Sequence, residues 1–455
     1  MTELPAARRR PVSARAVALE CLLAVEGKGS YLNQALSQTL RAYALERRDR
    51  DLATELCYGV ERRRLTLDWA VDLYLARGRR LSLPVRTLLR LGAYQLLFLD
   101  RVPPYAAVDE TVALTRRKAG EGAAKLVNAV LRRLAADRTD LPWPDEATDT
   151  VRALSVRYSH PQWLVERWLS RFGYDEAVAL MTANNGEAPL GIRVNRLRST
   201  PPAVQALLAS AGVTAEPSEL CDDFLLVQGG SDPGQLPGFR DGLFTPQDVA
   251  SGLVAKAVAP VPGAHVVDAC AGAGTKSCHL AELMAGEGQV TACDLYDHKL
   301  RLVALAAQRL GIDTIRTVLC DARRLSEGVG EVDAVLVDAP CTGLGTIRRR
   351  PDLRWRRQPE DIHELSRLQK EILAGAALAV RPGGVLVYST CTTEPEENEQ
   401  VVSWFLHEWP SFRLEELRHY WPERAALAQV VPGVAHFWPH KHGTDGFFVA
   451  RMRRV

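Results

Sequence analysis

Two cysteines stand at positions where a thiol could take part in chemistry. Cys341 follows the apolar run VLVDAP, and Cys391 follows the apolar run VLVYST. Each run predicts a buried β-strand, so each thiol is expected at a strand end, where open sheets of parallel strands bind ligands. Neighbouring strand ends lie close together, so both thiols should face one crevice. There, Cys341 could be a nucleophile, a metal ligand or a small core residue.

The other cysteines and the histidines give little support for a metal site. The chain has nine cysteines and no Cys-x-x-Cys pair, whereas zinc needs about four ligands at suitable spacing. The histidine cluster His440–His442 is expected to be a surface turn. Cys21, Cys57 and Cys278 fall on helical patterns, where a free cysteine is usually a small buried hydrophobe. We therefore expect no metal.

A glycine-rich turn and acids at strand ends predict a nucleoside-binding crevice. The turn DACAGAGTKS, residues 268–277, lets the backbone approach a ligand, but it has neither P-loop spacing nor a GxGxxG fingerprint. Asp294, about 20 residues beyond the turn, could accept both hydroxyls of a ribose. Asp321 could accept the amino group of adenine. Each acid alone could be a turn or helix-capping aspartate, but together they predict S-adenosylmethionine. NAD stays an alternative, although no set of residues for hydride transfer is visible.

A thiol beside a methyl donor suits a reaction on a pyrimidine ring. Carbon 5 of the ring is a poor nucleophile, but a thiolate that adds to carbon 6 turns the ring into an enamine. The thiol must be ionised, so its surroundings should be electropositive or hydrogen-bonding. The base must also leave its stack to enter the pocket. Asp338, just before Cys341, is placed to hydrogen-bond N3 and the amino group of cytosine.

A basic run follows the first of these thiols. The segment IRRRPDLRWRR, residues 347–357, carries several guanidinium groups, and such groups bind phosphates bidentately. Arg348, Arg349, Arg350 and Arg354 are therefore predicted to contact an RNA backbone. The alternative is a solvated charged loop.

The remaining pattern divides the chain into a helical part and a mixed part. Residues 1–140 show three- and four-residue apolar spacing and predict an all-α bundle, with residues 86–100 as its central helix. The Pro-rich stretch 141–149 is the predicted linker. Residues 150–244 predict a small α+β module. In residues 245–455 strands and helices alternate, which predicts a parallel sheet covered on both faces, with a C-terminal edge strand.

Charge and composition narrow the possible partners. Residues 1–140 carry 25 Lys and Arg against 16 Asp and Glu, a balance of +9, and the whole chain carries +2, which leaves −7 for the rest. A basic helical part is typical of proteins that meet a polyanion, although it could also be a solvated surface. No apolar run reaches the roughly 18 to 20 residues of a membrane span. The basic start MTELPAARRR lacks the apolar region of a secretory leader, and the scattered thiols fit a reducing cytoplasm.

These motifs resemble those of the RsmB/Sun (NOL/NOP) family of RNA 5-methylcytosine methyltransferases. The turn DACAGAGTKS resembles the family's first motif, and HGTDGFFVARM resembles its C-terminal motif. DAPCTGLGTIRRRPDLRW and YSTCTTEPEENEQVV resemble its two cysteine motifs. RDRDLATELCYGVERRR and LVNAVLRRL resemble the NusB-like RNA-binding domain of bacterial RsmB proteins. The resemblance covers nearly the whole chain and implies a NusB-like bundle, a small RNA-recognition-like α+β module and a Rossmann-like methyltransferase domain.

The resemblance also implies roles for individual residues. Cys391 would be the nucleophile, Cys341 would assist release of the product, and Asp338 would contact the cytosine. S-adenosylmethionine would bind these turn residues and acids: Cys270, Ala271, Gly272, Ala273, Gly274, Thr275, Lys276, Asp294, Asp321 and Asp338. One departure concerns the turn, because the family usually has Ala-Pro-Gly-Gly-Lys where this chain has Gly-Ala-Gly-Thr-Lys. Without the proline the turn is less pre-set.

The expected function is methylation of carbon 5 of a cytosine in small-subunit (16S) ribosomal RNA, through a covalent cysteine–carbon 6 adduct. Two alternatives stay open: the same chemistry on transfer RNA, and a non-catalytic RNA-binding assembly factor. DNA cytosine methyltransferases use the Pro-Cys thiol alone, so the second thiol counts against DNA. No membrane partner is expected. The chain is expected to act in the cytoplasm as a monomer.

Overall fold

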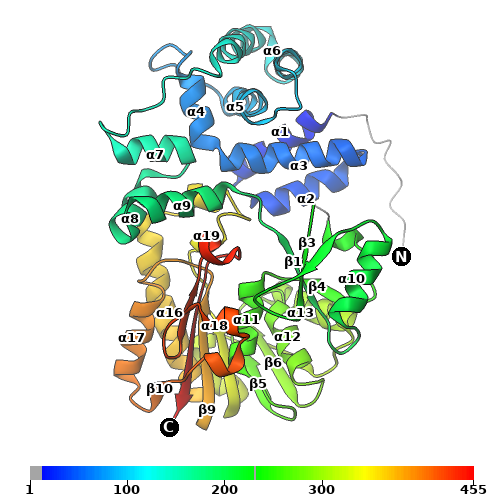
Figure 1. Ribbon diagram of the computed structural model, residues 1–455, viewed down its shortest axis with the longest axis vertical. Coiled ribbons are helices and arrows are strands. Elements are labelled where there is room, and N and C mark those ends of the chain that lie inside the picture. The colour runs from blue at the N-terminus through cyan, green and yellow to red at the C-terminus, as the bar shows by residue number, and fades with distance from the viewer. Residues whose placement is uncertain (1–12, 230–231) are drawn as a thin grey trace. The chain divides into compact units, whose positions relative to one another are not determined.

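The computed structural model describes residues 13–229 and 232–455, and the chain divides into two compact units (Figure 1). Unit 1 comprises Met1–Asn185 and Arg350–Arg356, and unit 2 comprises Gly186–Arg349 and Arg357–Val455. The basic start MTELPAARRR, for which no secretory leader is predicted, lies outside the described residues. Across the two described ranges, no helix has the length and apolar character needed to cross a membrane.

The described residues of unit 1 form helices and no strands, as the periodicity of the sequence predicts. Its helices are α1 (Ala14–Lys28), α2 (Leu32–Ala42), α3 (Arg47–Arg62), α4 (Arg64–Asp72), α5 (Leu83–Phe98), α6 (Pro104–Asp137), α7 (Thr150–Tyr158), α8 (Gln162–Phe172), α9 (Tyr174–Asn185) and α15 (Leu353–Arg356). Helix α5 contributes the longest run of buried residues to the core, which confirms the central helix predicted at residues 86–100. Its buried Arg90 pairs with Glu26 and Asp68, at 2.6 and 2.7 Å.

Residues 350–356 belong to unit 1 although they lie far along the chain. The guanidinium group of Arg354 is fully buried and donates to the carbonyls of Ser159 and Arg62, at 2.8 and 3.1 Å. The indole N–H of Trp355 donates to the carbonyl of Glu61 at 2.8 Å. These carbonyls lie at helix C-termini, where backbone acceptors lack partners within the helix. The segment therefore completes helix ends of the bundle.

Unit 2 begins with a small antiparallel sheet in the order β2-β3-β1-β4. Its elements are β1 (Leu190–Val194), α10 (Pro201–Ser210), β2 (Ala215–Pro217), β3 (Phe224–Val227), the short 3-10 helix η1 (Pro233–Gln235) and β4 (Phe244–Pro246). Arg193 of β1 anchors this sheet to the next layer, because it pairs with buried Glu282 at 2.7 Å and donates to the Thr275 carbonyl at 3.1 Å. A buried pair of this kind makes the loss of either partner costly.

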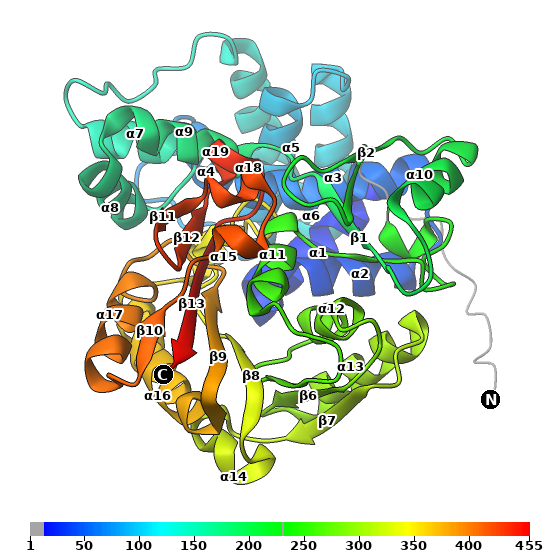
Figure 2. The ribbon, with the colours of Figure 1, turned by 60° about the horizontal axis from the view of Figure 1, so that its bottom comes forward.

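The larger sheet of unit 2 has nine strands, with the main order β11-β12-β13-β9-β8-β5-β6-β7 and β10 paired to β13. The strands are β5 (His265–Asp268), β6 (Gln289–Asp294), β7 (Ile315–Leu319), β8 (Val332–Asp338), β9 (Val380–Thr390), β10 (Phe412–Leu414), β11 (Gln429–Val431), β12 (Val434–Phe437) and β13 (Phe447–Arg454). Figure 2 shows β13, β9 and β8 in this order with β6 and β7 further across the sheet, and β5 lies between β8 and β6. Strands β5 to β9 pair in parallel, and β10 to β13 add antiparallel pairs. The sheet is therefore mixed.

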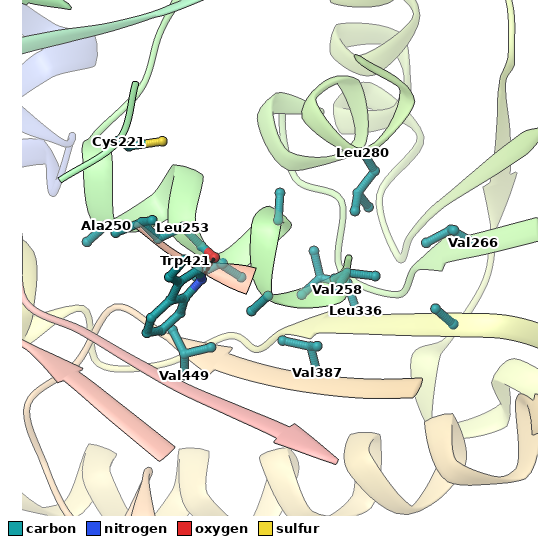
Figure 3. Packing of buried hydrophobic residues seen from close by; sticks show 14 of the residues in the cluster. Cys221, Ala250, Leu253, Val258, Val266, Leu280, Leu336, Val387, Trp421 and Val449 are labelled. Atoms are coloured by element: carbon teal, nitrogen blue, oxygen red, sulfur yellow. Dashed lines mark hydrogen bonds between the residues drawn. The ribbon is translucent and has the colours of Figure 1, made fainter. Parts of the chain in front are cut away.

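Helices cover both faces of this sheet. The helices of this part of unit 2 are α11 (Val249–Val258), α12 (Thr275–Leu283), α13 (Asp297–Leu310), η2 (Ala322–Arg324), α14 (Leu325–Val329), η3 (Leu344–Thr346), α16 (Pro359–Ala379), α17 (Glu399–Glu408), η4 (Arg418–Tyr420), α18 (Glu423–Ala426) and α19 (Pro439–His442). Residues of α11, α12 and α13 pack on one face, and residues of α14, α16 and α17 pack on the other. Figure 3 shows the first face, where Trp421 lies against Leu253 and its indole N–H donates to the Leu253 carbonyl at 3.0 Å.

One expectation from the sequence is wrong. The C-terminal strand β13 is not an edge strand, because β12 pairs with it on the side away from β9. Helices α7, α8 and α9, predicted to join the small α+β module, group with unit 1 in the structure, and the bounds of the module stay a prediction. In the predicted linker 141–149, Leu141 is buried in the helical core and Trp143 stacks on Trp69 with ring centroids 4.6 Å apart.

Glu61 gives unit 1 a specific pH dependence. It lies in α3 and is 2% exposed, and one of its carboxylate oxygens has no hydrogen-bond partner among the described residues. Burial raises the pKa of Glu61 to about 7. In the unfolded chain a glutamate releases its proton at about pH 4.3. The folded state therefore loses stability relative to the unfolded chain as the pH rises from that value to about 7.

We expect Glu61→Gln to stabilise the protein at pH 8 relative to the wild type, and much less at pH 4. The difference should be on the order of 3 kcal/mol, because the amide does not ionise. Thermal unfolding at both pH values measures it, and exposed Glu46→Gln provides the control. An equal gap between wild type and Glu61→Gln at both pH values would contradict the assignment.

Candidate active site

The candidate site lies at the edge of the large sheet where its parallel strands end. Strands β9, β8, β5, β6 and β7 pair in parallel, so their carboxyl ends share one edge. β8 ends at Asp338, and β6 ends at Asp294. The register of β8 and β9 sets Asp338 opposite Ser389. Cys341 and Cys391 stand in the loops that follow these two strands.

The two loops bring the thiols into contact. Sγ of Cys341 lies 3.3 Å from Sγ of Cys391, close enough for one thiol to donate a hydrogen bond to the other. The backbone N–H of Gly345 donates to the Cys391 carbonyl at 3.0 Å. A Cβ at position 345 would collide with the backbone of Gly446 and lie 2.8 Å from that Cys391 carbonyl oxygen. Glycine therefore permits the close packing of the three loops around the sulfurs.

The two sulfurs have different electrostatic surroundings. The hydrogen bond to Cys391, burial and the negative charge of Glu397 all raise the pKa of Cys341 well above its ordinary value. Cys341 therefore keeps its proton at neutral pH. Burial disfavours the charged form of Lys276, but the charge of Asp338 and the hydrogen bond to it raise the pKa of Lys276 overall, and Cys391 adds to the rise. A cation and an S–H donor thus both adjoin Cys391, and each favours a thiolate there.

Asp338 is held through both of its carboxylate oxygens. Its Oδ2 accepts from Nζ of Lys276 at 2.7 Å, and its Oδ1 accepts from Oγ of Ser389 at 2.8 Å. The Lys276 ammonium also lies 5.3 Å from the centroid of the Phe447 ring, within the range of a cation–π interaction. A carboxylate offers about four acceptor positions, so Asp338 retains capacity for donors on a bound ring.

The glycine-rich turn between β5 and α12 is built for close approach to a ligand. Gly272 and Gly274 have φ angles of 57° and 82°, which side-chain-bearing residues rarely adopt. The N–H of Gly272 donates to Oδ2 of Asp294 at 3.0 Å, and the N–H of Ala271 donates to the Cys293 carbonyl at 2.8 Å. These bonds tie the turn to β6, so it is fixed without the proline that the family usually has.

The remaining turn residues differ in exposure. Ala273 is exposed, whereas Cys270 is half-buried and packs against one core of the sheet. Asp268, at the end of β5, is buried and accepts from Oγ of Ser277 at 2.7 Å. Burial raises the pKa of Asp268 to about 6. Asp268 therefore supports the turn from the protein interior through Ser277, and its buried carboxylate is not exposed to a ligand.

Two acids at this edge fit the recognition of a nucleoside. Oδ1 of Asp294 accepts the N–H of Tyr296 at 3.0 Å, and each oxygen keeps acceptor capacity that suits the paired hydroxyls of a ribose. Asp321 accepts from the backbone and guanidinium of Arg323, and these bonds lower its pKa. Large apolar side chains beside the two acids are more than half exposed and suit a flat ring: Leu295, Tyr296 and Leu319. These acceptors and apolar side chains therefore fit S-adenosylmethionine.

Two of the arginines predicted to bind RNA are engaged inside unit 2. Nε of Arg349 donates to Asp445 at 2.8 Å, and its Nη2 donates to Asp248 at 2.9 Å. Arg348 donates to backbone carbonyls of two nearby loops. These contacts connect the loop after Cys341 to neighbouring segments. We therefore revise the expected role of both arginines from phosphate binding to support of the loop.

The other two arginines lie in the part of the sequence that belongs to unit 1. Arg354 is fully buried, and its donors serve backbone carbonyls at helix ends, so a phosphate cannot reach it. This burial removes Arg354 from the predicted RNA contacts. Arg350 is exposed. Of the four arginines, Arg350 is thus accessible to a ligand, and its contact with an RNA backbone stays a prediction.

Several side chains at the site were not singled out by sequence reasoning. Ser389 orients Asp338, Phe447 lies beside Lys276, and Glu397 accepts the backbone N–H of Thr342 at 2.8 Å. Each of the three lies inside a motif quoted above, in YST, DGFF and EPEENE respectively. The position of Ser389 near the end of the β9 run, shortly before Cys391, can be read from the sequence. Nothing in the sequence indicates that Glu397 is buried.

The histidine cluster forms a single helical turn, α19, and is not arranged around a common point. The backbone N–H of Trp438 donates to Nδ1 of His442 at 2.8 Å, so this ring closes the turn. All nine cysteines are free. Within residues 13–229 and 232–455, no three His, Cys, Asp or Glu side chains are grouped so that they could hold a metal ion.

Three family models match the chain in sequence order. The model of the NusB family matches residues 12–136, and the ferredoxin-like domain of RsmF/B-like methyltransferases matches residues 160–232. The model described as 16S rRNA methyltransferase RsmB/F matches residues 255–453. The last range contains the glycine-rich turn and both thiols.

Individual relatives match nearly the whole chain. The "Probable ribosomal RNA small subunit methyltransferase B" of Bacillus subtilis is 36% identical over 448 residues, which covers 98% of this chain and 99% of the relative. The "Ribosomal RNA small subunit methyltransferase B" of Vibrio cholerae is 35% identical over 447 residues, which covers 97% of this chain and 98% of the relative. The crystal structure of PH0851 is similar at a TM-score of 0.82 and 27% identity, and the match covers 98% of this chain and 100% of that one. The crystal structure of NSun6 from Pyrococcus horikoshii with SFG has a TM-score of 0.58 and 25% identity, and the match covers 65% of this chain and 98% of that one.

Replacement of Lys276 by methionine should slow the alkylation of Cys391. The lost cation would raise the pKa of the thiol by about one unit, which lowers the thiolate fraction about ten-fold at neutral pH. Iodoacetamide labelling followed by peptide mass spectrometry measures the rate at each cysteine. The control is Lys299→Met, which removes a lysine paired with Asp294 at 3.4 Å. Equal labelling of Cys391 in the wild type and Lys276→Met would contradict this electrostatic role.

Proposed function

Because the chain belongs to the RsmB/F family of 16S ribosomal RNA methyltransferases, we propose that it methylates carbon 5 of a cytosine in small-subunit ribosomal RNA. The observation that carries the proposal is the 3.3 Å contact between two thiols at the strand-end edge. Methylation of an exocyclic nitrogen or a hydroxyl needs no thiol. Methylation of carbon 5 of a pyrimidine benefits from one, because that carbon becomes nucleophilic once a thiolate has added to carbon 6.

S-adenosylmethionine is the methyl donor of this class of enzyme, and the related NSun6 structure contains SFG, an analogue of it. When bound, S-adenosylmethionine supplies the electrophilic methyl group that the activated carbon takes up. Asp294 would hold its ribose hydroxyls, and Asp321 would accept from its adenine amino group. The turn Cys270–Lys276 and Asp338 would border the rest of the molecule.

The first step assigned to the protein is addition of the Cys391 thiolate to carbon 6. Lys276 and the S–H of Cys341 stabilise this thiolate before the attack. As the sulfur–carbon bond forms, the electron pair of the double bond between carbons 5 and 6 moves toward carbon 5 and, through carbon 4, charge moves onto N3. Asp338, held by Lys276 and Ser389, would accept a hydrogen bond from the amino group of the cytosine and so orient the ring. As charge moves onto N3, that atom would take up a proton from water and donate a hydrogen bond to Asp338, and the proton would return to water on release. Carbon 5 then becomes nucleophilic.

The last step assigned to the protein is release of the methylated base. The proton on carbon 5 leaves to water, and its electron pair re-forms the double bond between carbons 5 and 6. The sulfur–carbon 6 bond breaks, and its electron pair returns to Cys391. Cys341, which keeps its proton, would donate its S–H to the departing thiolate. Release should therefore depend on Cys341 more strongly than attack does.

RNA binding is assigned to the helical part of the chain and to the loop after Cys341. The match to the NusB family, the balance of +9 over residues 1–140 and exposed Arg350 support this assignment. Positive charge of this kind supplies affinity for a phosphate backbone without selecting a sequence. The target cytosine would then be selected by the fold of the RNA around it.

The two thiols should behave differently when each is replaced by alanine. Cys391→Ala should form no covalent RNA complex and no methylated cytosine, because the attacking sulfur is missing. Cys341→Ala should accumulate a complex that survives denaturing electrophoresis, because only release is impaired. Incubation with S-adenosylmethionine and a small-subunit ribosomal RNA transcript, followed by a denaturing gel, measures both.

Two results would overturn parts of this proposal. A trapped complex in Cys391→Ala and none in Cys341→Ala would exchange the roles of the two thiols. Wild-type protein that binds RNA but not S-adenosylmethionine in calorimetry would favour a non-catalytic assembly factor. Bisulfite sequencing of ribosomal and transfer RNA from a strain that lacks the gene distinguishes the two RNA substrates.

A further inference from the structure

A buried glutamate lies beneath the loop that carries Cys341. Glu397 is 0% exposed. Its Oε1 accepts the backbone N–H of Thr342 at 2.8 Å, and its Oε2 accepts from the Thr342 hydroxyl at 2.5 Å. Thr342 directly follows Cys341 in the chain. The carboxylate thus fixes both the backbone and the side chain of the residue next to the first thiol.

The same carboxylate is connected to the loop that carries Cys391. Thr392 directly follows Cys391, and its hydroxyl lies 2.7 Å from the hydroxyl of Thr342. Thr392 also forms a side-chain hydrogen bond with Glu397. Both threonines are at most 1% exposed. One buried carboxylate and two hydroxyls therefore join the residues that follow the two thiols.

Further contacts hold Glu397 in place. The buried hydroxyl of Tyr388, in β9, donates to the Glu397 carbonyl at 2.6 Å. Nε2 of Gln369, in α16, donates to Oε1 of Glu397 at 3.0 Å and to the carbonyl of Pro340 at 2.9 Å. Burial raises the pKa of Glu397, and the hydrogen bonds from Thr342, Gln369 and Thr392 oppose that rise. The Glu397 carboxylate therefore forms hydrogen bonds with both loops that carry the thiols and with helix α16.

We propose that Glu397 is a positioning residue that holds Cys341 against Cys391 and thereby sets the rate at which the covalent adduct is released. This inference rests on the proposed function. Attack on the base needs the Cys391 sulfur, which is placed by the end of β9, and the nearby cation. Release needs the Cys341 S–H within hydrogen-bond reach of the departing sulfur. A displacement of the Cys341 loop should therefore slow release more than attack.

Two substitutions separate the length of the side chain from its charge. Glu397→Asp keeps the carboxylate but withdraws it by one methylene, so it can no longer reach both threonine loops. Glu397→Gln keeps the length and an acceptor oxygen, and the two hydroxyls can rotate to suit the amide. Glu399→Asp makes the same shortening at a glutamate that pairs with His436 at 3.1 Å, and it provides the matched control.

A single-turnover experiment follows formation and decay of the covalent complex. Enzyme in excess over labelled small-subunit ribosomal RNA is mixed with S-adenosylmethionine and quenched in detergent at successive times. For Glu397→Asp we expect decay to slow about ten-fold or more while formation changes less than about three-fold, since small misplacements at a reacting centre have effects of this size. Glu397→Gln and Glu399→Asp should remain within about three-fold of the wild type in both phases.

Three outcomes would overturn the inference. They are wild-type decay in Glu397→Asp, an equal slowing of formation and decay in that variant, or a Glu397→Gln variant as impaired as Glu397→Asp. If Glu397→Asp does not fold, Thr392→Val takes its place, because it removes the hydroxyl between the two loops; unchanged decay in that variant also overturns the inference. Absence of any complex in wild type and in Cys341→Ala would instead refute the proposed function.

Discussion

The contact between the two sulfurs depends on the parallel pairing of β8 with β9. That pairing sets Asp338 opposite Ser389, so the two strands end at the same level and their loops leave the sheet side by side. Side chains along a strand alternate between faces, so a shift of one residue would turn Ser389 away from Asp338. It would also separate the cysteines that follow each strand. The register of one strand pair therefore determines whether the site can exist.

The surroundings then make two identical side chains chemically different. Cys391 adjoins Lys276, whose pKa is raised by Asp338, whereas the hydrogen bond to Cys391 and burial raise the pKa of Cys341. In the proposed function Cys341 would retain its proton, and the site would offer Cys391 as a nucleophile beside a hydrogen-bond donor. Lys276, which ends the glycine-rich turn, would then serve the thiol as well as the cofactor pocket.

Much of the fold and part of the site could be predicted from the sequence, because both depend on local patterns. Apolar runs that end in Asp338 and Thr390 predict strand ends, and neighbouring strand ends predict that the following thiols meet. The alternation of strands and helices predicts a parallel sheet with two covered faces. The cores confirm both covered faces, and β5 to β9 are parallel, but the antiparallel pairs of β10 to β13 make the whole sheet mixed. The helical periodicity of residues 86–100 likewise predicts the buried helix α5.

The remainder could not be predicted, because it depends on partners distant in the sequence. Nothing near Arg354 indicates that its guanidinium group will bind carbonyls such as that of Ser159, 195 residues away. Glu397 stands in an acidic run that suggests a solvated surface, yet it meets Thr342, 55 residues earlier, in the interior. The strand β13 is the last one in the given sequence, but it does not lie at the edge of the sheet, because β12 pairs with it on the side away from β9. Charged residues are the hardest to place, since the same residue type serves a surface and a buried network.

Methylation of carbon 5 through a thiol adduct can be tested through the hydrogen that this carbon loses. Small-subunit ribosomal RNA can be transcribed with cytidine tritiated at carbon 5 and incubated with the wild-type protein and S-adenosylmethionine carrying a carbon-14 methyl group. We expect one tritium released to water for each methyl group incorporated. Methyl incorporation without release of tritium would place the reaction at another atom and contradict methylation of carbon 5.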